Sequence, residues 1–401
     1  MELADKKACT GCGVCAYVCP KGCITFITDK TNDIAYPIID DKKCISCGKC
    51  RNACPALRPI DRNEPLHAYA AWSLDEEERR TSASGGIAAE IYKLAINKGW
   101  SIVGAAFRKD FEVSLELSDD PDSIKKFKNS KYVFSSAANI YQEINAKLKS
   151  GKKVAIIALP CQIAAIRKIF KRDIDDLLLV DLVCHGTTPP AYLDQYISYM
   201  ERRYERKVSD IIFRDPAVGT HLFALALYDT QKNCFYSAPA VATKDLYQYG
   251  YHQMITYREN CYHCIYANRQ RGADITLSDY KGLGRYKPCA FTSENVNCVL
   301  TNTPKGENVI LTLIKAHKIF AEERPVEEPI QGDQQLRQPS PKTYARILFE
   351  QNYTRYKAFV PVMQSVYRRA ELRKKIFWFC KIPKRILNKM KRAFTVTFFY
   401  L

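Results

Sequence analysis

The sequence has no long apolar run. No stretch of about 18 consecutive apolar residues occurs, whereas a helix that crosses a bilayer needs about 20. The first residues, MELADKKACTGC, also have no apolar segment behind their charges, so the pattern of a secretory signal is missing. At 401 residues and 47% hydrophobic content, the chain can bury the cores of two or three domains. We expect a soluble, cytoplasmic protein.

Two nucleotide-binding fingerprints are also missing. No G-x-G-x-x-G follows a candidate strand, and no G-x-x-x-x-G-K-[ST] occurs. The first motif holds a pyrophosphate in Rossmann folds, and the second forms the P-loop. Their absence argues against both kinds of site, so any dinucleotide must bind in another way.

The positive charge is unevenly placed. The chain carries a formal charge of +18, and residues 368–401, with 11 Lys or Arg and one acidic residue, account for +10 of it. Nucleic-acid-binding domains concentrate such charge on a folded face, so we expect no nucleic-acid partner. The basic tail also contains aromatic residues such as Trp378, and could bind an anionic membrane surface on the cytoplasmic side. The alternative is a solvated helix, divided by Pro383, that docks on this chain or a partner.

Cysteine, by contrast, is abundant, with 17 in the chain and nine among the first 54 residues. Residues 9–20 read CTGCGVCAYVCP and residues 44–55 read CISCGKCRNACP, so C-x2-C-x2-C-x3-C-P occurs twice. In two-cluster ferredoxins the first three cysteines of each copy bind one cluster and the fourth binds the other. The pattern predicts cluster 1 on Cys9, Cys12, Cys15 and Cys54, and cluster 2 on Cys44, Cys47, Cys50 and Cys19.

A zinc site is the alternative for these motifs, because zinc also binds C-x2-C pairs. Three cysteines at two successive x2 spacings, repeated and each followed by Pro, favour [4Fe–4S] clusters. Residues 23–40 predict two short strands joined by a turn, and we expect Cys23 to be a small core residue. Residues 1–57 are thus expected to form a small ferredoxin domain of the bacterial type.

From about residue 68 the pattern changes to alternating strands and helices. Residues 68–72, 100–107, 152–159 and 176–183 predict strands, and residues 85–99 and 162–170 predict helices. Such alternation is typical of an α/β fold with a mainly parallel sheet. We predict an α/β protein, α+β overall, with this domain at 68–340 and a helical region with the basic tail at 341–401. Residues 208–300 are expected to extend the sheet or to form a smaller β region.

Four further cysteines form a less regular group. Cys161 and Cys184 each follow a predicted parallel strand, at the edge where ligands collect in open α/β sheets, and Cys261 and Cys264 form a C-x2-C pair. Four thiolates could hold a third [4Fe–4S] cluster. Alternatively, the first two are buried apolar residues and the other two are half of a zinc site. His185 adjoins Cys184 and could orient it or transfer protons.

A serine- and glycine-rich stretch, TSASGGIAAE, lies at the predicted start of a helix directly after a strand. The free N–H groups and the dipole at such a helix end can bind a phosphate, and Gly85 and Gly86 would admit a close approach. A serine N-cap such as Ser82 or Ser84 followed by glycine is also ordinary helix capping. Both interpretations remain open at this point.

Six stretches of the larger domain resemble the family of beta subunits of coenzyme F420 hydrogenases and dehydrogenases, which are iron–sulfur flavoproteins. They are SASGGIAAE, NSKYVFS, ALPCQIAAI, DLVCHGTTPP, RENCYHCIYANRQRGADITLSDYKG and NTPKG, within residues 68–310. A fused two-cluster ferredoxin is a usual companion in this family. The resemblance implies FAD, a further [4Fe–4S] cluster beside it, and electron transfer between clusters, flavin and a two-electron partner.

The resemblance also implies site residues. FAD contacts would fall on Ser84, Gly85, Gly86, Lys131, Pro160, Gln162 and Asp274. Third-cluster ligands would be Cys161, Cys184, Cys261 and Cys264. Family members often have G-D-F-W-G where this chain has SDYKG, with Ser278 for Gly and Lys281 for Trp. Because that aromatic residue could enclose the substrate, use of the deazaflavin coenzyme does not carry over.

We therefore predict an FAD- and iron–sulfur-dependent oxidoreductase that acts on an unidentified organic substrate. A redox partner protein or reduced ferredoxin would be its partner, and Lys131 and His185 are the candidate proton donors. The alternative is a non-catalytic electron-transfer adaptor for a partner enzyme. By analogy with family members in polysaccharide gene clusters, that enzyme could belong to a surface-polysaccharide pathway.

Overall fold

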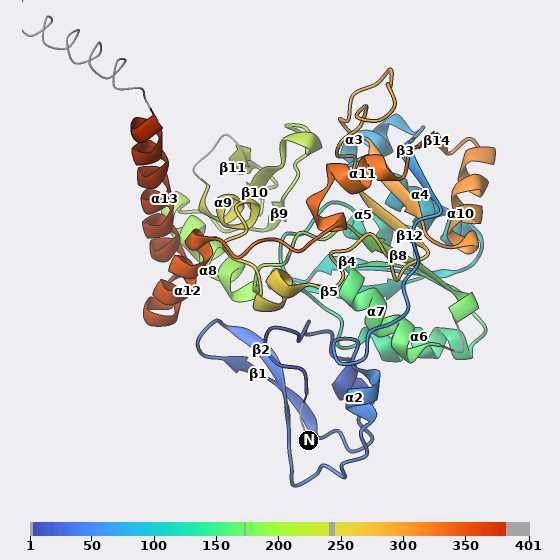
Figure 1. Cartoon of the computed structure of the whole chain (residues 1–401), viewed down its shortest axis with the longest axis horizontal. Coiled ribbons are helices and arrows are strands. Elements are labelled where there is room, and N and C mark those ends of the chain that lie inside the picture. The colour runs from blue at the N-terminus through green and yellow to red at the C-terminus, as the bar shows by residue number, and fades with distance from the viewer. Residues whose placement is uncertain (1–2, 172–173, 240–244, 382–401) are drawn as a thin grey trace, which may run out of the picture.

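The computed structural model describes residues 3–171, 174–239 and 245–381, of which 374–381 are described by their backbone alone. A small N-terminal unit, residues 3–57, lies beneath a larger α/β domain, and a long C-terminal helix stands at one side (Figure 1). In the described ranges no helix is both long and apolar enough to cross a membrane. Residues 382–401, which hold most of the basic tail expected to contact a membrane, lie outside the described residues.

The N-terminal unit contains the predicted hairpin. Strands β1 (Ile24–Asp29) and β2 (Ile34–Ile39) pair antiparallel, with Ile24 opposite Ile39. The carboxylate of Asp29 accepts hydrogen bonds from the N–H and the hydroxyl of Thr31, which closes the turn.

Two short helices follow the glycines of the cysteine motifs. Helix α1 (Val14–Tyr17) follows Gly13, and α2 (Lys49–Ala53) follows Gly48. These glycines have φ of 81° and 72° and lie between the second and third cysteine of each motif. A residue with a side chain is strained in this conformation, so glycine lets both motifs turn tightly at the same place.

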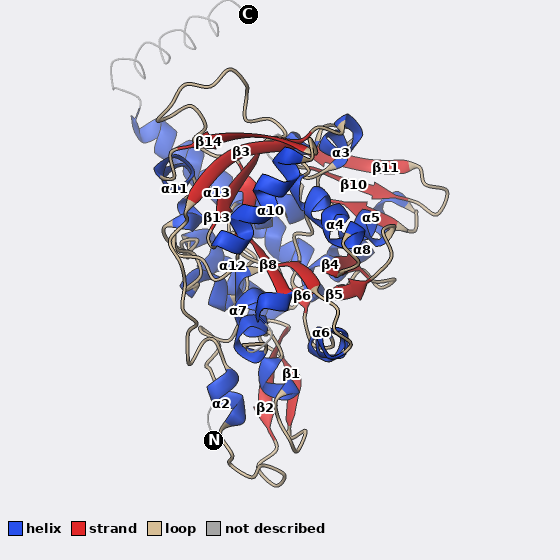
Figure 2. Cartoon of the chain, turned by 90° about the vertical axis from the view of Figure 1, so that its right-hand side faces the viewer, coloured by secondary structure: helices blue, strands red, loops and turns tan. Residues whose placement is uncertain are grey.

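Within the described residues, the larger domain is built on a nine-stranded sheet (Figure 2). In spatial order the strands are β14 (Ile319–Arg324), β3 (His67–Ser73), β13 (Asn297–Thr301), β12 (Ile275–Asp279), β8 (Leu177–Leu182), β7 (Val154–Ala158), β4 (Ser101–Phe107), β5 (Val113–Ser118) and β6 (Ser135–Ser136). Strands β12, β8, β7 and β4 form the predicted parallel centre.

Strands outside this centre are mostly antiparallel. Strand β5 pairs antiparallel with β4, and β13, β3 and β14 continue the other side of the sheet antiparallel. The connections explain the difference: residues 108–112 join β4 to β5, and residues 280–296 join β12 to β13 without a helix. Parallel neighbours need a crossover, commonly a helix, whereas antiparallel neighbours do not.

Helices cover both faces of the sheet. Helices α4 (Ile87–Asn97) and α10 (Pro304–Lys315) pack on one face, and α6 (Ile140–Lys149) and α7 (Pro160–Ile169) pack on the other. Neighbouring residues of the central strands face opposite cores: Ile157 belongs to the first core, and Ile156 to the second. This two-residue period explains why the central strands are apolar throughout.

The expected β region at 208–300 both extends the main sheet and forms a smaller one. Strands β9 (Asp210–Ile212), β10 (Ala224–Tyr228) and β11 (Cys234–Pro239) make the separate sheet. It shares an aromatic-rich core with α8 (Pro190–Tyr204), α9 (Leu246–His252), α12 (Tyr344–Tyr356) and α13 (Phe359–Lys381). The predicted helical region after residue 341 is therefore present through α13.

The remaining elements are short. They are α3 (Glu76–Thr81), α5 (Ser123–Phe127) and α11 (Glu327–Gly332), with 3-10 turns η1 (Ile174–Asp176), η2 (Thr220–Leu222), η3 (Glu259–His263) and η4 (Gln334–Leu336). Helix α3 corrects one expectation, because residues 82–86 follow this helix and not a strand directly. The helix is capped by Asp75, whose carboxylate accepts the Glu78 N–H.

The N-terminal unit is bonded to the larger domain at several points. In the β1–β2 turn, the carbonyl of Asn32 accepts a hydrogen bond from the Tyr192 hydroxyl at 3.2 Å, and Asp33 accepts one from the Tyr353 hydroxyl at 2.6 Å. Cys12 and Val14 also pack in the core beneath α6 and α7. The cysteine motifs are thus built into the same body as the sheet.

Candidate iron–sulfur and flavin site

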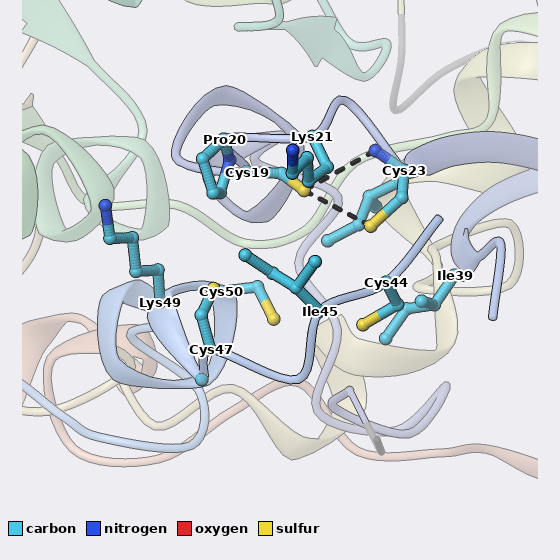
Figure 3. Close-up of a pocket in the computed structure, with 12 residues that line it drawn as sticks. Cys19, Pro20, Lys21, Cys23, Ile39, Cys44, Ile45, Cys47, Lys49 and Cys50 are labelled. Atoms are coloured by element: carbon cyan, nitrogen blue, oxygen red, sulfur yellow. Dashed lines mark hydrogen bonds between the residues drawn. The ribbon is translucent and has the colours of Figure 1, made fainter. Parts of the chain in front are cut away.

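The second cysteine motif surrounds a pocket of about 320 Å³ in the N-terminal unit (Figure 3). Cys19 reaches this pocket from the first motif, because α1 ends at Tyr17 and Pro20 then redirects the chain. The structure brings together the four cysteines assigned from the sequence to cluster 2: Cys19, Cys44, Cys47 and Cys50.

Cys23 lies in the wall of the same pocket. It is 4% exposed, as expected of a core residue, but its sulfur is 3.3 Å from that of Cys19. Its N–H also donates to the Cys19 sulfur at 3.4 Å. The hydrogen bond with the Cys19 thiol raises the pKa of Cys23 to about 12, so Cys23 stays a neutral thiol beside the pocket.

The first motif forms a second group of thiols. Cys9, Cys12 and Cys15 are buried and Cys54 is half-buried. Burial raises the pKa of Cys12 to about 11 and that of Cys15 to about 12, and neighbouring thiols of the group add to both effects. The sulfurs of Cys9, Cys12 and Cys15 each accept a hydrogen bond from a backbone N–H one or two residues further on. These donors suit thiolates that are held by a metal cluster.

The larger domain brings four of its seven cysteines, Cys161, Cys184, Cys261 and Cys264, around one pocket of about 520 Å³. Cys161 lies in the first turn of α7, just after β7, and Cys184 follows β8, so both lie at the carboxyl edge of the parallel centre. Cys261 and Cys264 come from η3 and the residue after it. Burial raises the pKa of Cys264 to about 11 and keeps the pKa of Cys161 well above its ordinary value.

Two of the donor sets have the number of thiols that a [4Fe–4S] cluster needs. Among the residues that the structure describes, no three His, Cys, Asp or Glu side chains are placed to hold a single metal ion. The second motif and the larger domain instead place four thiols around a pocket, as a [4Fe–4S] cluster requires. Tyr266 also lines the 520 Å³ pocket, and its buried hydroxyl has no hydrogen-bond partner within the described ranges. A cluster sulfur would supply the missing acceptor.

The first motif and the larger domain's cysteines are neighbours. The thiolate of Cys12 contributes to raising the pKa of Cys161, and both act on Tyr141, whose hydroxyl donates to the Cys12 carbonyl at 2.6 Å. Thr10, from the first motif, lines the pocket of the larger domain. The pocket of the second motif, by contrast, is lined by residues 19–50.

The glycine loop, residues 82–86, uses most of its polar groups within the protein. The hydroxyl of Ser84 donates to the carbonyl of Val296 at 2.9 Å. A Cβ on Gly85 would lie 2.5 Å from the Ala71 carbonyl oxygen and 2.9 Å from the Asn297 N, so glycine is required there by strand packing. Gly86 has a φ of 88° and precedes α4 without a side-chain cap. The Ile87 N–H donates to the Asn297 side chain at 3.2 Å, and both glycines are buried, so the loop is closed to a ligand in this structure.

Pro160, Gln162 and Asp274, which are also expected flavin contacts, lie in three different surroundings. Pro160 lies beside Cys161 in the wall of the 520 Å³ pocket. The side-chain amide of Gln162 is used within the protein, since it donates to the Ser135 carbonyl and accepts from the Leu159 N–H.

Asp274 lies at the opposite end of the parallel strands. Its carboxylate accepts hydrogen bonds from the Leu179 N–H at 2.9 Å and the Thr303 hydroxyl at 2.8 Å. These contacts join β8, β12 and α10 at the amino end of β12. The structure does not bring Asp274 to the carboxyl edge where Cys161 and Cys184 lie.

Lys131 is enclosed beside the smaller sheet. Its ammonium donates to the Lys128 carbonyl at 2.9 Å, and burial lowers its pKa to about 8, with Asp210 and Glu116 opposing the shift. A lysine with this pKa can release a proton near neutral pH.

Comparison with known proteins agrees with this architecture. Residues 8–57 and 36–99 each match a 4Fe-4S dicluster domain. Residues 151–327 match the C-terminal region of the beta subunits of coenzyme F420 hydrogenase/dehydrogenase. Residues 151–327 are therefore similar to this family of beta subunits. The resemblance inferred from the six sequence stretches is thereby confirmed.

Two curated relatives share part of the chain. One of the subunits of the F420H2 dehydrogenase of Methanosarcina mazei is 25% identical over 195 residues, which cover 46% of this chain and 55% of the relative. The coenzyme F420-dependent sulfite reductase of Methanocaldococcus jannaschii is 30% identical over 175 residues, 42% of this chain and 26% of the relative. The chain thus spans about half of one relative and about a quarter of the other.

A solved structure is also similar. A chain of the F420-reducing [NiFe] hydrogenase complex from Methanosarcina barkeri aligns with 79% of this chain and 94% of its own length. The TM-score is 0.44 and the sequence identity 18%.

Lys281, which stands where family members often have Trp, contacts His185 in the wall of the 520 Å³ pocket. Its ammonium lies 2.7 Å from Nε2 of His185 and 3.1 Å from the carboxylate of Asp333, which is 2% exposed. Burial and then the Lys281 charge lower the pKa of His185 to about 4. His185 is therefore neutral at pH 7 and accepts a hydrogen bond from Lys281, so it is a poor proton donor. The sequence did not indicate Asp333, which belongs to no motif.

Proposed function

We propose that the chain is an iron–sulfur flavoprotein of the oxidoreductase class that links a redox partner protein to an organic substrate. One observation carries the proposal: the first motif and the cysteines of the larger domain lie together, since Thr10 of the first motif lines the pocket that holds Cys161, Cys184, Cys261 and Cys264. Two electron-carrying groups in this arrangement would be neighbours within one chain. The family match supports a redox role.

The cysteine groups described above would hold three [4Fe–4S] clusters. Cluster 1 would be bound by Cys9, Cys12, Cys15 and Cys54, cluster 2 by Cys19, Cys44, Cys47 and Cys50, and cluster 3 by Cys161, Cys184, Cys261 and Cys264. Bound clusters carry single electrons, and FAD exchanges one or two. The chain's own contribution is to bury the thiols, to direct backbone N–H groups at them and to fix their spacing.

The FAD assignment rests on fewer contacts. Pro160 lies beside cluster 3 in the wall of the pocket, whereas Gly85 and Gly86 are buried and Gln162 and Asp274 are hydrogen-bonded within the protein. Lys131 remains a candidate proton donor. Lys281 takes the place of His185 as the other candidate, because it donates a hydrogen bond to the neutral His185.

A redox partner would dock beside cluster 2. Cys47 is exposed and Ile45 is 57% exposed at this end of the N-terminal unit. Lys21 and Lys49 line the same pocket, and the exposed Lys42 and Lys43 precede it beside the exposed Asp40 and Asp41. An apolar centre flanked by this net positive charge suits an acidic electron-carrier protein, because complementary charge speeds encounter.

A non-catalytic adaptor is the second candidate. It is favoured by the glycine loop, whose serine hydroxyl and tight packing are engaged within the protein and not free for a flavin. An adaptor would contain the clusters and no flavin.

Anaerobic purification with iron, sulfide and flavin quantified tests both. About 12 irons and one flavin per chain would support the proposed function, and about 12 irons without flavin, even after reconstitution with FAD, would support the adaptor. About 8 irons would remove cluster 3, and with it the proposed link between the domains.

A further inference from the structure

Arg258 is a buried cation that has no carboxylate partner among the residues that the structure describes. It is 3% exposed, its Nη2 has no hydrogen-bond partner, and its Nε reaches Asn260 only at 3.4 Å. Other buried arginines in the described part of the chain form ion pairs, such as Arg271 with Asp181 at 3.0 Å and Arg324 with Glu328 at 2.9 Å. The missing partner of Arg258 therefore needs a physical explanation.

The residue is anchored on the side of the larger domain's cysteines. Its N–H donates to the Thr187 carbonyl at 2.9 Å, and its own carbonyl accepts the Cys261 N–H at 3.0 Å. Thr187 lines the 520 Å³ pocket, and its hydroxyl lies 3.9 Å from the Cys261 sulfur. The backbone of Arg258 thus belongs to the loop that holds this group.

The guanidinium points across to the first motif. A Cβ placed on Gly11 would lie 2.7 Å from Nη2, so the side chain reaches the backbone between Cys9 and Cys12. The guanidinium carbon lies 4.3 Å from the centre of the Phe134 ring and 6.0 Å from that of Tyr36. Its charge lowers the pKa of both Cys9 and Cys261, against the larger effect of burial.

We propose that Arg258 is a positioning residue whose charge offsets the negative charge of cluster 1 and cluster 3 together. This inference rests on the proposed function, since it needs both clusters. Burying a guanidinium without a carboxylate partner is costly, because its charge is taken out of water and a guanidinium is not neutralised in a protein. Eight thiolates on two sides supply the counter-charge that no carboxylate provides. By the same attraction, Arg258 favours the more negative, reduced form of each cluster and raises both reduction potentials.

Redox titration of the anaerobic full-length protein, followed by EPR, tests the inference. In R258Q we expect the ratio of reduced to oxidised cluster to fall about tenfold for clusters 1 and 3 at their wild-type midpoints, which corresponds to about 59 mV for one electron. Cluster 2 serves as the internal control, because its pocket is lined by residues 19–50 and not by Arg258. K49Q, an exposed change beside cluster 2, is the second control and should leave clusters 1 and 3 unchanged.

R258K separates charge from shape. If R258Q shifts clusters 1 and 3 and R258K restores them at least in part, the inference stands. Full iron content in R258Q with unchanged potentials overturns it. Should R258Q lose iron, retention in R258K supports a need for the charge, and equal loss in both variants shows a packing role and overturns the inference. A wild-type protein with about 8 irons would instead refute cluster 3 itself.

Discussion

The hydroxyl of Tyr141 donates a hydrogen bond to the backbone carbonyl of Cys12, with 2.6 Å between the two oxygens. Tyr141 belongs to α6 of the larger domain, whereas Cys12 belongs to the first cysteine motif. The tyrosine is fully buried, so the bond fixes the loop that we assign to cluster 1 on the domain that we assign to cluster 3.

Removing the Tyr141 hydroxyl should weaken the attachment of the N-terminal unit to the larger domain. Y141F leaves the buried Cys12 carbonyl without its tyrosine donor, and we expect the free energy of unfolding to fall by about 1–3 kcal/mol. Chemical unfolding under anaerobic conditions measures the change. Y286F is the matched control, because Tyr286 is 54% exposed and should cost little. Equal stability of both variants would show that the bond contributes nothing.

Cluster 3 should be separable from the other two. We expect C161A to lose about 4 of about 12 irons per chain, because three thiols hold a [4Fe–4S] cluster poorly. C298A is the control: Cys298 lies in β13 away from the cysteine groups and is a buried cysteine, 1% exposed, whereas Cys161 is half-buried. Iron and sulfide analysis would contradict the assignment if C161A kept its full complement or if C298A lost as much.

Lys131 should make stability depend on pH. Its pKa is lowered to about 8 by burial, so between about pH 8 and pH 10.4 the folded state has lost a proton that the unfolded state retains. Stability therefore rises with pH across this window, and the cost of the buried charge is fully present below pH 8. We expect K131M to raise the free energy of unfolding by about 1–3 kcal/mol at pH 7 and by much less at pH 10. A gain independent of pH would indicate a packing effect instead.

The lysines around cluster 2 should control the encounter with a partner. Reversing one charge in K49E should slow cluster reduction by an acidic ferredoxin several-fold at low salt, with little effect at high salt. Stopped-flow absorbance at several ionic strengths measures this. K315E, on α10 of the larger domain, is the control and should leave the rate unchanged. A rate insensitive to K49E would place the entry point elsewhere.

The sequence predicts what is encoded locally. The hairpin at 23–40, the strands at 152–159 and 176–183, and the helix after Gly86 follow from spacing and periodicity, because each is decided within about ten residues. The grouping of Cys161 with Cys184 was also predictable, since the ends of neighbouring parallel strands meet at one edge.

Contacts between distant segments were not predictable in this way. No local pattern indicates that Cys12 lies near Cys161, or that Asp333 joins Lys281 and His185. The short helix α3 was missed because its first turn, EEE, has no apolar period, and only Asp75 signals its start. The position of Asp274 was not predictable for a related reason: its motif does not indicate which end of β12 it occupies.

The β1–β2 hairpin is fastened by Tyr192 to α8 and by Tyr353 to α12. Tyr141 bonds a third point of the same unit, at Cys12. Hydrogen bonds at three points fix the ferredoxin-like unit on the larger domain, so it cannot move as a separate domain on a flexible linker would. Exchange between its cysteine groups and those of the larger domain would then need no diffusional search. Its rate should be the same in dilute and concentrated protein, and should depend on the separation that the fold has already set.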